Sequence, residues 1–253
     1  MTELLQAHNL HWSAGGNHIV NDVSLSVSTG ETLGIVGPNG SGKTSLLRLL
    51  AGLTKPDNGT VFIDGADAAS MNRKQIALRM AYVEQLGHTE LELKVRDVIA
   101  LGRVPHQKSW MAPGSTGTEV IDRAAESTGV THLLNRAWSK LSGGERQRTH
   151  IARALAQETP MILLDEPTNH LDISHQLEIL RLTRNSEATA VTVLHDLNLA
   201  AMFCDRIIVM FGGQVVAEGN PSAVLTEELL HDVFLVHTRI THDDGLPHIR
   251  FLI

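Results

Sequence analysis

A glycine-rich stretch near the start of the chain has the residue types and the spacing of a phosphate-binding loop. Residues 37–44, GPNGSGKT, fit the pattern G-x-x-x-x-G-K-[ST] between an apolar run and a helical pattern. Glycines leave backbone N–H groups free to surround phosphate oxygens, and the helix N-terminus adds partial positive charge. We expect Lys43 to neutralise the β- and γ-phosphates of a nucleotide and Thr44 to hold Mg²⁺. The predicted nucleotide-binding residues are Gly37, Pro38, Asn39, Gly40, Ser41, Gly42, Lys43, Thr44 and Ser45.

Two carboxylates follow a second buried-strand pattern. The run 161–164 is apolar and leads directly into Asp165 and Glu166. Open α/β sheets place their ligands at the carboxyl ends of the strands, where these two acids would lie. Asp165 is predicted to hold Mg²⁺ through its water shell, and Glu166 to polarise the water that attacks the γ-phosphate. Such a pair is common by itself, and it gains this meaning only beside the phosphate loop.

A third stretch, residues 141–148, has two interpretations that do not exclude each other. Ser142 and Glu145 have the spacing of a capping box, which predicts a helix running to about residue 157. The hydroxyl of Ser142, the N–H groups of Gly143 and Gly144 and the helix dipole also form a second anion site. The chain would then carry two half-sites for one phosphate chain.

The elements that position these residues follow from the apolar pattern. Short runs rich in Val and Ile alternate with helical patterns, which predicts an α/β fold with a mainly parallel sheet. The first 30 residues instead predict an N-terminal antiparallel β element around the turn at 13–17. Residues 86–155 are predicted to form an inserted helical subdomain interrupted by a loop at 109–118, and Asp244-Gly245 predicts a C-terminal hairpin. The strand and helix pairs are 32–36 with 43–52, 161–164 with 173–184, and 190–194 with 197–203.

Composition narrows the class of protein. The chain has 253 residues, of which 42% are hydrophobic, so a sizeable core is expected. A formal net charge of −7 argues against nucleic acid as a partner. The single cysteine, Cys204, suits a reducing compartment. The first residues do not predict a signal peptide, and the apolar runs are shorter than the roughly 18 residues of a membrane span.

With these motifs in this order, the sequence resembles the ATP-binding cassette (ABC) ATPase family over nearly its whole length. The resemblance implies one domain with a P-loop NTPase core at 1–85 and 156–253 and a helical signature subdomain at 86–155. It also implies a homodimer that forms on ATP binding, in which Ser142 and Gly144 of one subunit cap the γ-phosphate held by Lys43 of the other. The residues that carry it are the loop 37–44, Gln85, the signature 141–148, Asp165, Glu166, Asn169 to Asp172 and His195.

The resemblance also assigns roles to residues that would be unremarkable alone. Gln85 looks like the glutamine that contacts Mg²⁺ and senses the γ-phosphate, and His195 looks like the histidine that binds the γ-phosphate and positions the water. Asp172 resembles the acid that links the two sites of the dimer. The family often stacks an aromatic residue on adenine, but Ala14 stands at that place. Trp12 is two residues earlier and either stacks on adenine instead or packs in the core.

Two further segments point to one branch of the family. Residues 95–106 and 195–200 resemble the ATP-binding subunits of importers of iron chelates, haem and cobalamin. This implies a subunit on the cytoplasmic face of the cell membrane that binds two copies of a transmembrane permease and works indirectly with a substrate-binding protein. A ferric siderophore is the first candidate cargo. The alternatives are the stand-alone ABC ATPase of iron-sulfur cluster assembly and a nucleotide-binding regulator without turnover, and Glu166 argues against the regulator.

Overall fold

A computed structural model describes residues 2–84, 93–107, 117–169, 171–185 and 188–252. The chain forms two compact units, and each is described by itself. Unit 1 comprises Met1–Met71 with Thr189–Ile253, and unit 2 comprises Asn72–Ala188. The segment 86–155, predicted as a helical insertion, falls within unit 2, while the functional boundaries inferred from the family likeness stay a prediction.

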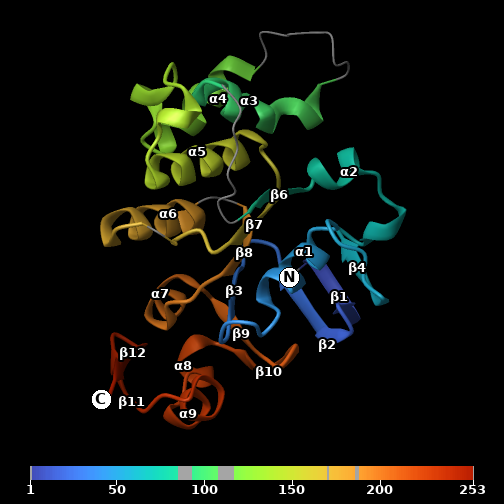
Figure 1. The fold of residues 1–253 in the computed structure, drawn as a ribbon, viewed down its shortest axis with the longest axis vertical. Helices are drawn as coiled ribbons and strands as arrows, with labels where there is room; N and C mark the ends of the chain where they lie inside the picture. The colour runs from blue at the N-terminus through green and yellow to red at the C-terminus, as the bar shows by residue number, and fades with distance from the viewer. Residues whose placement is uncertain (1, 85–92, 108–116, 170, 186–187, 253) are drawn as a thin grey trace. The chain divides into compact units, whose positions relative to one another are not determined.

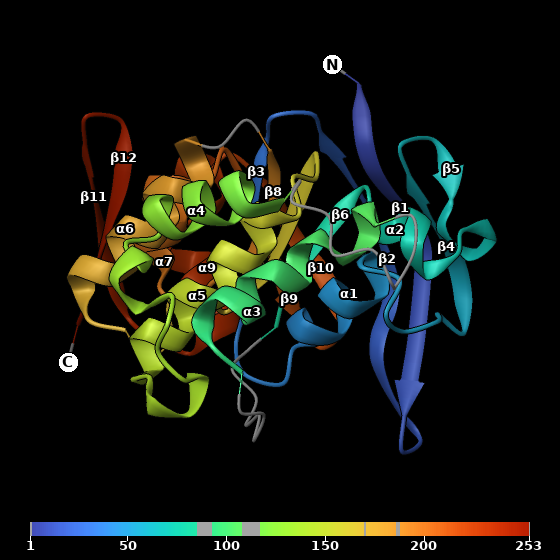
Figure 2. The same ribbon diagram turned by 90° about the horizontal axis from the view of Figure 1, so that it is seen from above.

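Unit 1 contains an antiparallel sheet at the N-terminal end of the chain, as predicted. Its strands are β1 (Glu3–Ala14), β2 (Asn17–Ser28), β4 (Asn58–Ile63) and β5 (Ala66–Asp67), in the order β2-β1-β4-β5 (Figures 1 and 2). The turn between β1 and β2 uses Gly15 and Gly16, both with positive φ, as the turn residues in the sequence predict. The short helix η1 (Ala68–Ser70) follows β5.

The second sheet of unit 1 is mostly parallel. β3 (Thr32–Val36) lies between β8 (Thr189–Val193) and β9 (Arg206–Phe211) and is parallel to both. The three strands are almost entirely buried, which explains why they are continuous apolar runs. An antiparallel strand, β10 (Gln214–Gly219), extends the sheet beyond β9.

Helices and a hairpin complete unit 1. The helices are α1 (Lys43–Leu50), α7 (Leu197–Phe203), α8 (Pro221–Val224) and α9 (Glu227–Phe234). The predicted C-terminal hairpin is confirmed as β11 (Thr238–Asp243) and β12 (Leu246–Phe251), with Asp244 and Gly245 both at positive φ in the turn. Positive φ at both central residues is the geometry that an Asp-Gly pair favours.

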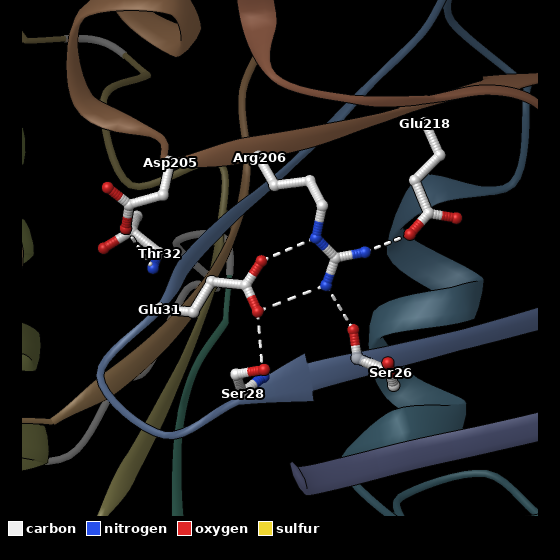
Figure 3. A network of polar contacts seen from close by, with 7 residues as sticks. All are labelled: Ser26, Ser28, Glu31, Thr32, Asp205, Arg206 and Glu218. Carbon is white, nitrogen blue, oxygen red and sulfur yellow. Dashed lines mark hydrogen bonds and ion pairs between the residues drawn. The ribbon is translucent and has the colours of Figure 1, made fainter. Parts of the chain in front are cut away.

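A network centred on one arginine joins three strands of unit 1 (Figure 3). Arg206 Nε and Nη2 donate to the two carboxylate oxygens of Glu31 at 2.6 and 3.2 Å. The same guanidinium donates to Glu218 and to the carbonyl oxygen of Ser26. The hydrogen bonds to Glu31 raise the pKa of Arg206 above its ordinary value. The network thereby fixes the start of β9 to β2, to the turn before β3 and to the end of β10.

Unit 2 combines two parallel strands with the helical segments. β6 (Met80–Val83) pairs with β7 (Met161–Asp165), and α6 (Ile173–Asn185) follows β7. The other elements are α2 (Arg73–Ala77), α3 (Val95–Ala100), η2 (Leu101–His106), α4 (Thr118–Ser127), η4 (Thr131–Leu133), η5 (Trp138–Lys140) and α5 (Gly143–Ala156). Figure 2 shows α3, α4 and α5 side by side, and buried apolar residues of all three form one cluster. The prediction of an α/β fold with mainly parallel strands, an antiparallel element and a helical part is confirmed.

Candidate functional site

The phosphate loop of unit 1 requires glycine at two positions for lack of space. Gly37 follows β3 with φ +152°, and a Cβ atom there would lie 2.2 Å from the carbonyl oxygen of Met210. Gly42 has φ +99°, and its Cβ would lie 2.4 Å from the carbonyl oxygen of Ile19. Gly42 also caps α1, so the helix N-terminus opens directly onto the loop. This is the geometry in which backbone N–H groups can approach phosphate oxygens.

The polar side chains of the loop fit a phosphate chain. Lys43 is buried, and its ammonium donates to the carbonyl oxygens of Gly37 at 2.8 Å and Pro38 at 2.9 Å. Within the described part of the chain, the hydroxyl of Ser41 is buried and has no hydrogen-bond partner. A buried hydroxyl that makes no hydrogen bond lowers the stability of the fold, and a phosphate oxygen in the loop would act as its acceptor. The loop therefore has the curved backbone, the cation and the unsatisfied donor that a phosphate needs.

His195 lies at the same edge of the sheet as this loop. In the register of the parallel strands, Ile35 of β3 is opposite Val193 of β8, and the N–H of Leu194 donates to the Ile35 carbonyl oxygen at 3.1 Å. Gly37, the first residue of the loop, is two residues after Ile35, and His195 is two residues after Val193. Both therefore lie at the carboxyl ends of adjacent strands. The side chain of His195 is exposed. Unit 1 thus brings the predicted phosphate ligands and the predicted γ-phosphate histidine to one edge.

The two predicted acids lie at the carboxyl end of β7 in unit 2. Asp165 is completely buried, and the hydroxyl of Tyr82 in β6 donates to its Oδ2 at 3.1 Å. Glu166 has φ +51°, a left-handed conformation that is uncommon for glutamate. The side-chain amide of Asn169 donates to the Glu166 carboxylate, and the Asn169 N–H donates to the Glu166 carbonyl oxygen at 3.2 Å. Residues in such sparsely populated conformations cluster at functional sites.

The capping box predicted at the start of α5 is present. The Ser142 N–H donates to Glu145 Oε2 at 2.7 Å, and the Glu145 N–H donates to Ser142 Oγ at 3.3 Å. The first of these bonds holds the pKa of the Glu145 carboxyl below its ordinary value. In this cap the serine hydroxyl accepts a hydrogen bond, so it keeps its own proton available for another acceptor. The cap and the anion site are therefore chemically compatible.

Asp172 precedes α6 in an ordered arrangement that the sequence did not predict. Its Oδ1 accepts three hydrogen bonds, from the Ser174 hydroxyl at 2.8 Å, the His175 N–H at 3.0 Å and His175 Nδ1 at 2.7 Å. These donors, with the backbone N–H of His175 first, lower the pKa of the Asp172 carboxyl. The Asp172 side chain is 66% exposed.

Two further candidates have different outcomes. Trp12 is half-buried in β1 opposite Val20 of β2, a position that fits either packing or contact with a base. Gln85 lies outside the described residues.

Unit 1 thus holds Trp12, the phosphate loop and His195, whereas unit 2 holds Asp165, Glu166, Ser142, Gly144 and Asp172. Tyr82 and Asn169 are the contacts of the acids to which sequence reasoning gave no role.

Comparisons with known proteins identify the family. A family model described as "ABC transporter" matches residues 20–169. The petrobactin import ATP-binding protein FpuD of Bacillus anthracis is 40% identical over 248 residues, which cover 96% of this chain and 90% of that protein. The ferric enterobactin transport ATP-binding protein FepC of Escherichia coli K12 is 36% identical over 94% of this chain and 90% of its own length. The cobalamin import ATP-binding protein BtuD of Halobacterium salinarum is 40% identical over 91% of this chain, which spans only 58% of that relative.

Solved structures agree with these matches. A candidate metal-chelate type ABC transporter in an inward-facing conformation matches all of this chain and 98% of its own, with a TM-score of 0.85 and 26% identity. The ADP conformation of an ATP-binding cassette of an ABC transporter matches 93% of this chain and 99% of its own, with a TM-score of 0.82 and 25% identity. The chain therefore belongs to the ABC transporter family, as the motifs in its sequence predict.

Proposed function

We propose that this chain is the ATP-hydrolysing subunit of an importer of a metal chelate, with a ferric siderophore as the first candidate cargo and haem or cobalamin next. The observation that carries the proposal is Glu166, an acid in a left-handed conformation directly after the buried Asp165 at the end of β7. A protein that only binds nucleotide would not need a water-activating group there. The cargo class is supported by the names of three relatives, which refer to petrobactin import, ferric enterobactin transport and cobalamin import.

In this proposal, different residues of the chain bind the phosphates, hold Mg²⁺ and activate the attacking water. The loop 37–45 binds the phosphates of ATP through its backbone N–H groups, and Lys43 leaves the loop carbonyls to neutralise the β- and γ-phosphates. Thr44, Gln85 and Asp165 would hold Mg²⁺, which would supply positive charge beside those phosphates. Glu166 polarises the attacking water, and His195 holds the γ-phosphate in line with it.

Hydrolysis also requires a second copy of the chain. In the proposed homodimer, the Ser142 hydroxyl donates a hydrogen bond to the γ-phosphate held by the other subunit, and the N–H of Gly144 donates a second one beside it. Gly143 leaves this helix end accessible, because a Cβ there would meet no atom within 4 Å, whereas a Cβ at Gly144 would lie 3.2 Å from Leu171 Cδ2. ATP contacts both subunits only when they are closed, so ATP favours the closed state and hydrolysis releases it.

A short apolar surface in unit 2 fits a permease contact. Leu101 and Val104 of η2 are 48% and 46% exposed. Between them Gly102 is pressed against α5, where a Cβ would lie 2.2 Å from the Arg153 carbonyl oxygen. Arg103 donates to the Ala156 carbonyl oxygen at 2.7 Å, so η2 is fixed to the C-terminal end of α5. We place the docking of each permease subunit on this segment, at the cytoplasmic face of the membrane.

The binding of a permease also accounts for how the chain would act in a membrane. Within the described residues, no helix combines the length and the apolar character needed to cross a bilayer. The substrate-binding protein would act through the permease, and nucleic acid has no part in the proposal.

The first test is ATP hydrolysis by the purified chain and by Glu166→Gln, with gel filtration of both in ATP and Mg²⁺. We expect turnover by the wild type and a loss of at least 100-fold in the variant, which then elutes as an ATP-bound dimer. Glu126→Gln, an exposed glutamate of α4, is the matched control and should keep full activity. Turnover by Glu166→Gln at the wild-type rate would refute the assignment of Glu166.

A second test addresses the partner. The double variant Leu101→Ser with Val104→Ser should lose co-purification with a polytopic membrane protein and keep its basal ATP hydrolysis. Val216→Ser is the control, because Val216 in β10 is also 46% exposed. Wild-type protein that hydrolyses ATP but captures no membrane protein would favour the stand-alone ATPase of iron-sulfur cluster assembly.

A further inference from the structure

We propose that Tyr82 is a positioning residue that orients the Asp165 carboxylate for Mg²⁺, an inference that rests on the proposed function. Tyr82 is the single tyrosine of the chain. The phosphate loop, the signature and the predicted catalytic acids give it no role. In unit 2 the Tyr82 side chain lies beside Asp165 and hydrogen-bonds to its carboxylate.

The two faces of the β6–β7 pair have different surroundings. Ala81 and Val83 of β6, with Ile162 and Leu164 of β7, belong to a buried cluster that includes Ile151 of α5 and Ile179 of α6. Successive residues of a strand point to opposite faces. Tyr82, Leu163 and Asp165 therefore share the other face of these two strands.

The register places the tyrosine hydroxyl within reach of the carboxylate. Tyr82 pairs with Leu163, and Asp165 lies two residues further along β7 on the same face. A tyrosine side chain that leans along its strand spans such a step, and its hydroxyl lies 3.1 Å from Asp165 Oδ2. An ionised carboxylate only accepts hydrogen bonds, so the tyrosine must be the donor.

This hydrogen bond has consequences for a metal. Asp165 is 0% exposed, and a buried carboxylate needs donors to compensate for lost water. A donor fixed to the neighbouring strand also limits rotation of the carboxylate about its terminal bond, so that Oδ1 keeps one direction. Groups that orient side chains ligating a metal directly contribute roughly 10- to 100-fold to metal affinity, and because Asp165 is predicted to hold Mg²⁺ through its water shell, the lower end of this range is expected. Tyr82 would thereby prepare Asp165 for Mg²⁺ before the nucleotide arrives.

The test measures binding rather than turnover. A fluorescent ATP analogue is titrated onto wild type and Tyr82→Phe, first in EDTA and then with increasing Mg²⁺. We expect equal affinity in EDTA and an apparent Mg²⁺ affinity about tenfold weaker in Tyr82→Phe. Thr128→Val removes another buried hydroxyl of unit 2, which donates to the Ala124 carbonyl oxygen at 2.9 Å, and should leave both affinities unchanged. Equal Mg²⁺ affinities of wild type and Tyr82→Phe would overturn the inference.

A second measurement uses the wild-type protein and needs no variant. Labelling of tyrosine with ¹³C at the ring carbon that bears the hydroxyl gives one signal, because the chain has one tyrosine. The signal should move when Mg²⁺ is added to the ADP-bound protein, and a fixed signal would contradict the inference. Wild-type protein whose nucleotide affinity does not respond to Mg²⁺ would instead overturn the proposed function itself.

Discussion

Lowering the pH is predicted to destabilise the protein through a single buried histidine of α5. His150 is 9% exposed and lies against Trp138, with their ring centroids 4.9 Å apart. Its Nδ1 is buried and has no hydrogen-bond partner among the described residues. Burial, and then the positive charge of Arg153, lower the pKa of His150 from 6.5 to about 4. The folded protein therefore keeps this imidazole neutral at a pH at which the unfolded chain has protonated it.

The size of the effect follows from the two pKa values. Between pH 6.5 and pH 4 this histidine binds more protons in the unfolded chain than in the folded one, so the stability contributed by His150 is complete above this window and is lost as the pH decreases through it. At about 1.4 kcal/mol for each unit of pKa, the whole window corresponds to about 3 kcal/mol. Roughly 2 kcal/mol of this is lost between pH 7 and pH 5.

The assay is urea unfolding, followed by far-ultraviolet circular dichroism at pH 7 and at pH 5. The matched variant is His150→Phe, which keeps an aromatic ring against Trp138 and cannot be protonated. Both proteins share the other titrating groups, so the difference between their pH responses isolates His150. The wild type should lose about 2 kcal/mol more than the variant. Equal losses in the two proteins would refute the reasoning.

Two other substitutions have separable effects. Ser142→Asp should keep the stability of α5, because aspartate also caps helices, but it should abolish ATP-driven dimerisation on gel filtration, because the new carboxylate has no proton to donate and repels the γ-phosphate. Ser142→Ala should lose both dimerisation and about 1 kcal/mol in urea unfolding, and a dimer formed by Ser142→Asp would contradict the proposed role. Trp12→Ala should weaken ATP binding by about tenfold in calorimetry if the indole stacks on adenine, whereas unchanged affinity would show that Trp12 only packs in β1.

The fold could be predicted where burial and periodicity agree. The strand at 32–36 has the predicted bounds, because a strand buried on both faces is a continuous apolar run. The helix at 197–203 also has the predicted bounds, because Asp196 caps its first turn. The pattern gave no strand at 58–63, where Gly59 resembles a turn residue. Gly59 is required there because a Cβ would lie 2.3 Å from the Asn9 carbonyl oxygen in β1. That contact depends on tertiary structure and leaves no local signal.

The residue types of the site could be predicted from the sequence, whereas most of the contacts that support these residues could not. The phosphate loop and the capping box are local in sequence, so their spacing carries their geometry. Tyr82 and Asp165 are 83 residues apart, and only the register of β6 and β7 brings them together. The hydrogen bonds from Ser174 and His175 to Asp172 are local in sequence. An aspartate directly before a helix often accepts a hydrogen bond from a backbone N–H of the first turn, so the place of Asp172 before the helical pattern at 173–184 is a signal that could have revealed them.

The network around Arg206 also has a consequence for the exchange of amide hydrogens. Glu31 accepts from the Ser28 N–H at 2.8 Å, and Asp205, which directly precedes Arg206, accepts from the Thr32 N–H at 2.9 Å, so both amides are held by side chains (Figure 3). Exchange of the Thr32 hydrogen requires its bond to Asp205 at the start of β9 to break, and exchange of the Ser28 hydrogen requires release of Glu31, which Arg206 also holds. Their exchange rates would report opening of the strand that carries the phosphate loop, from the opposite end of that strand and without a label on any nucleotide contact.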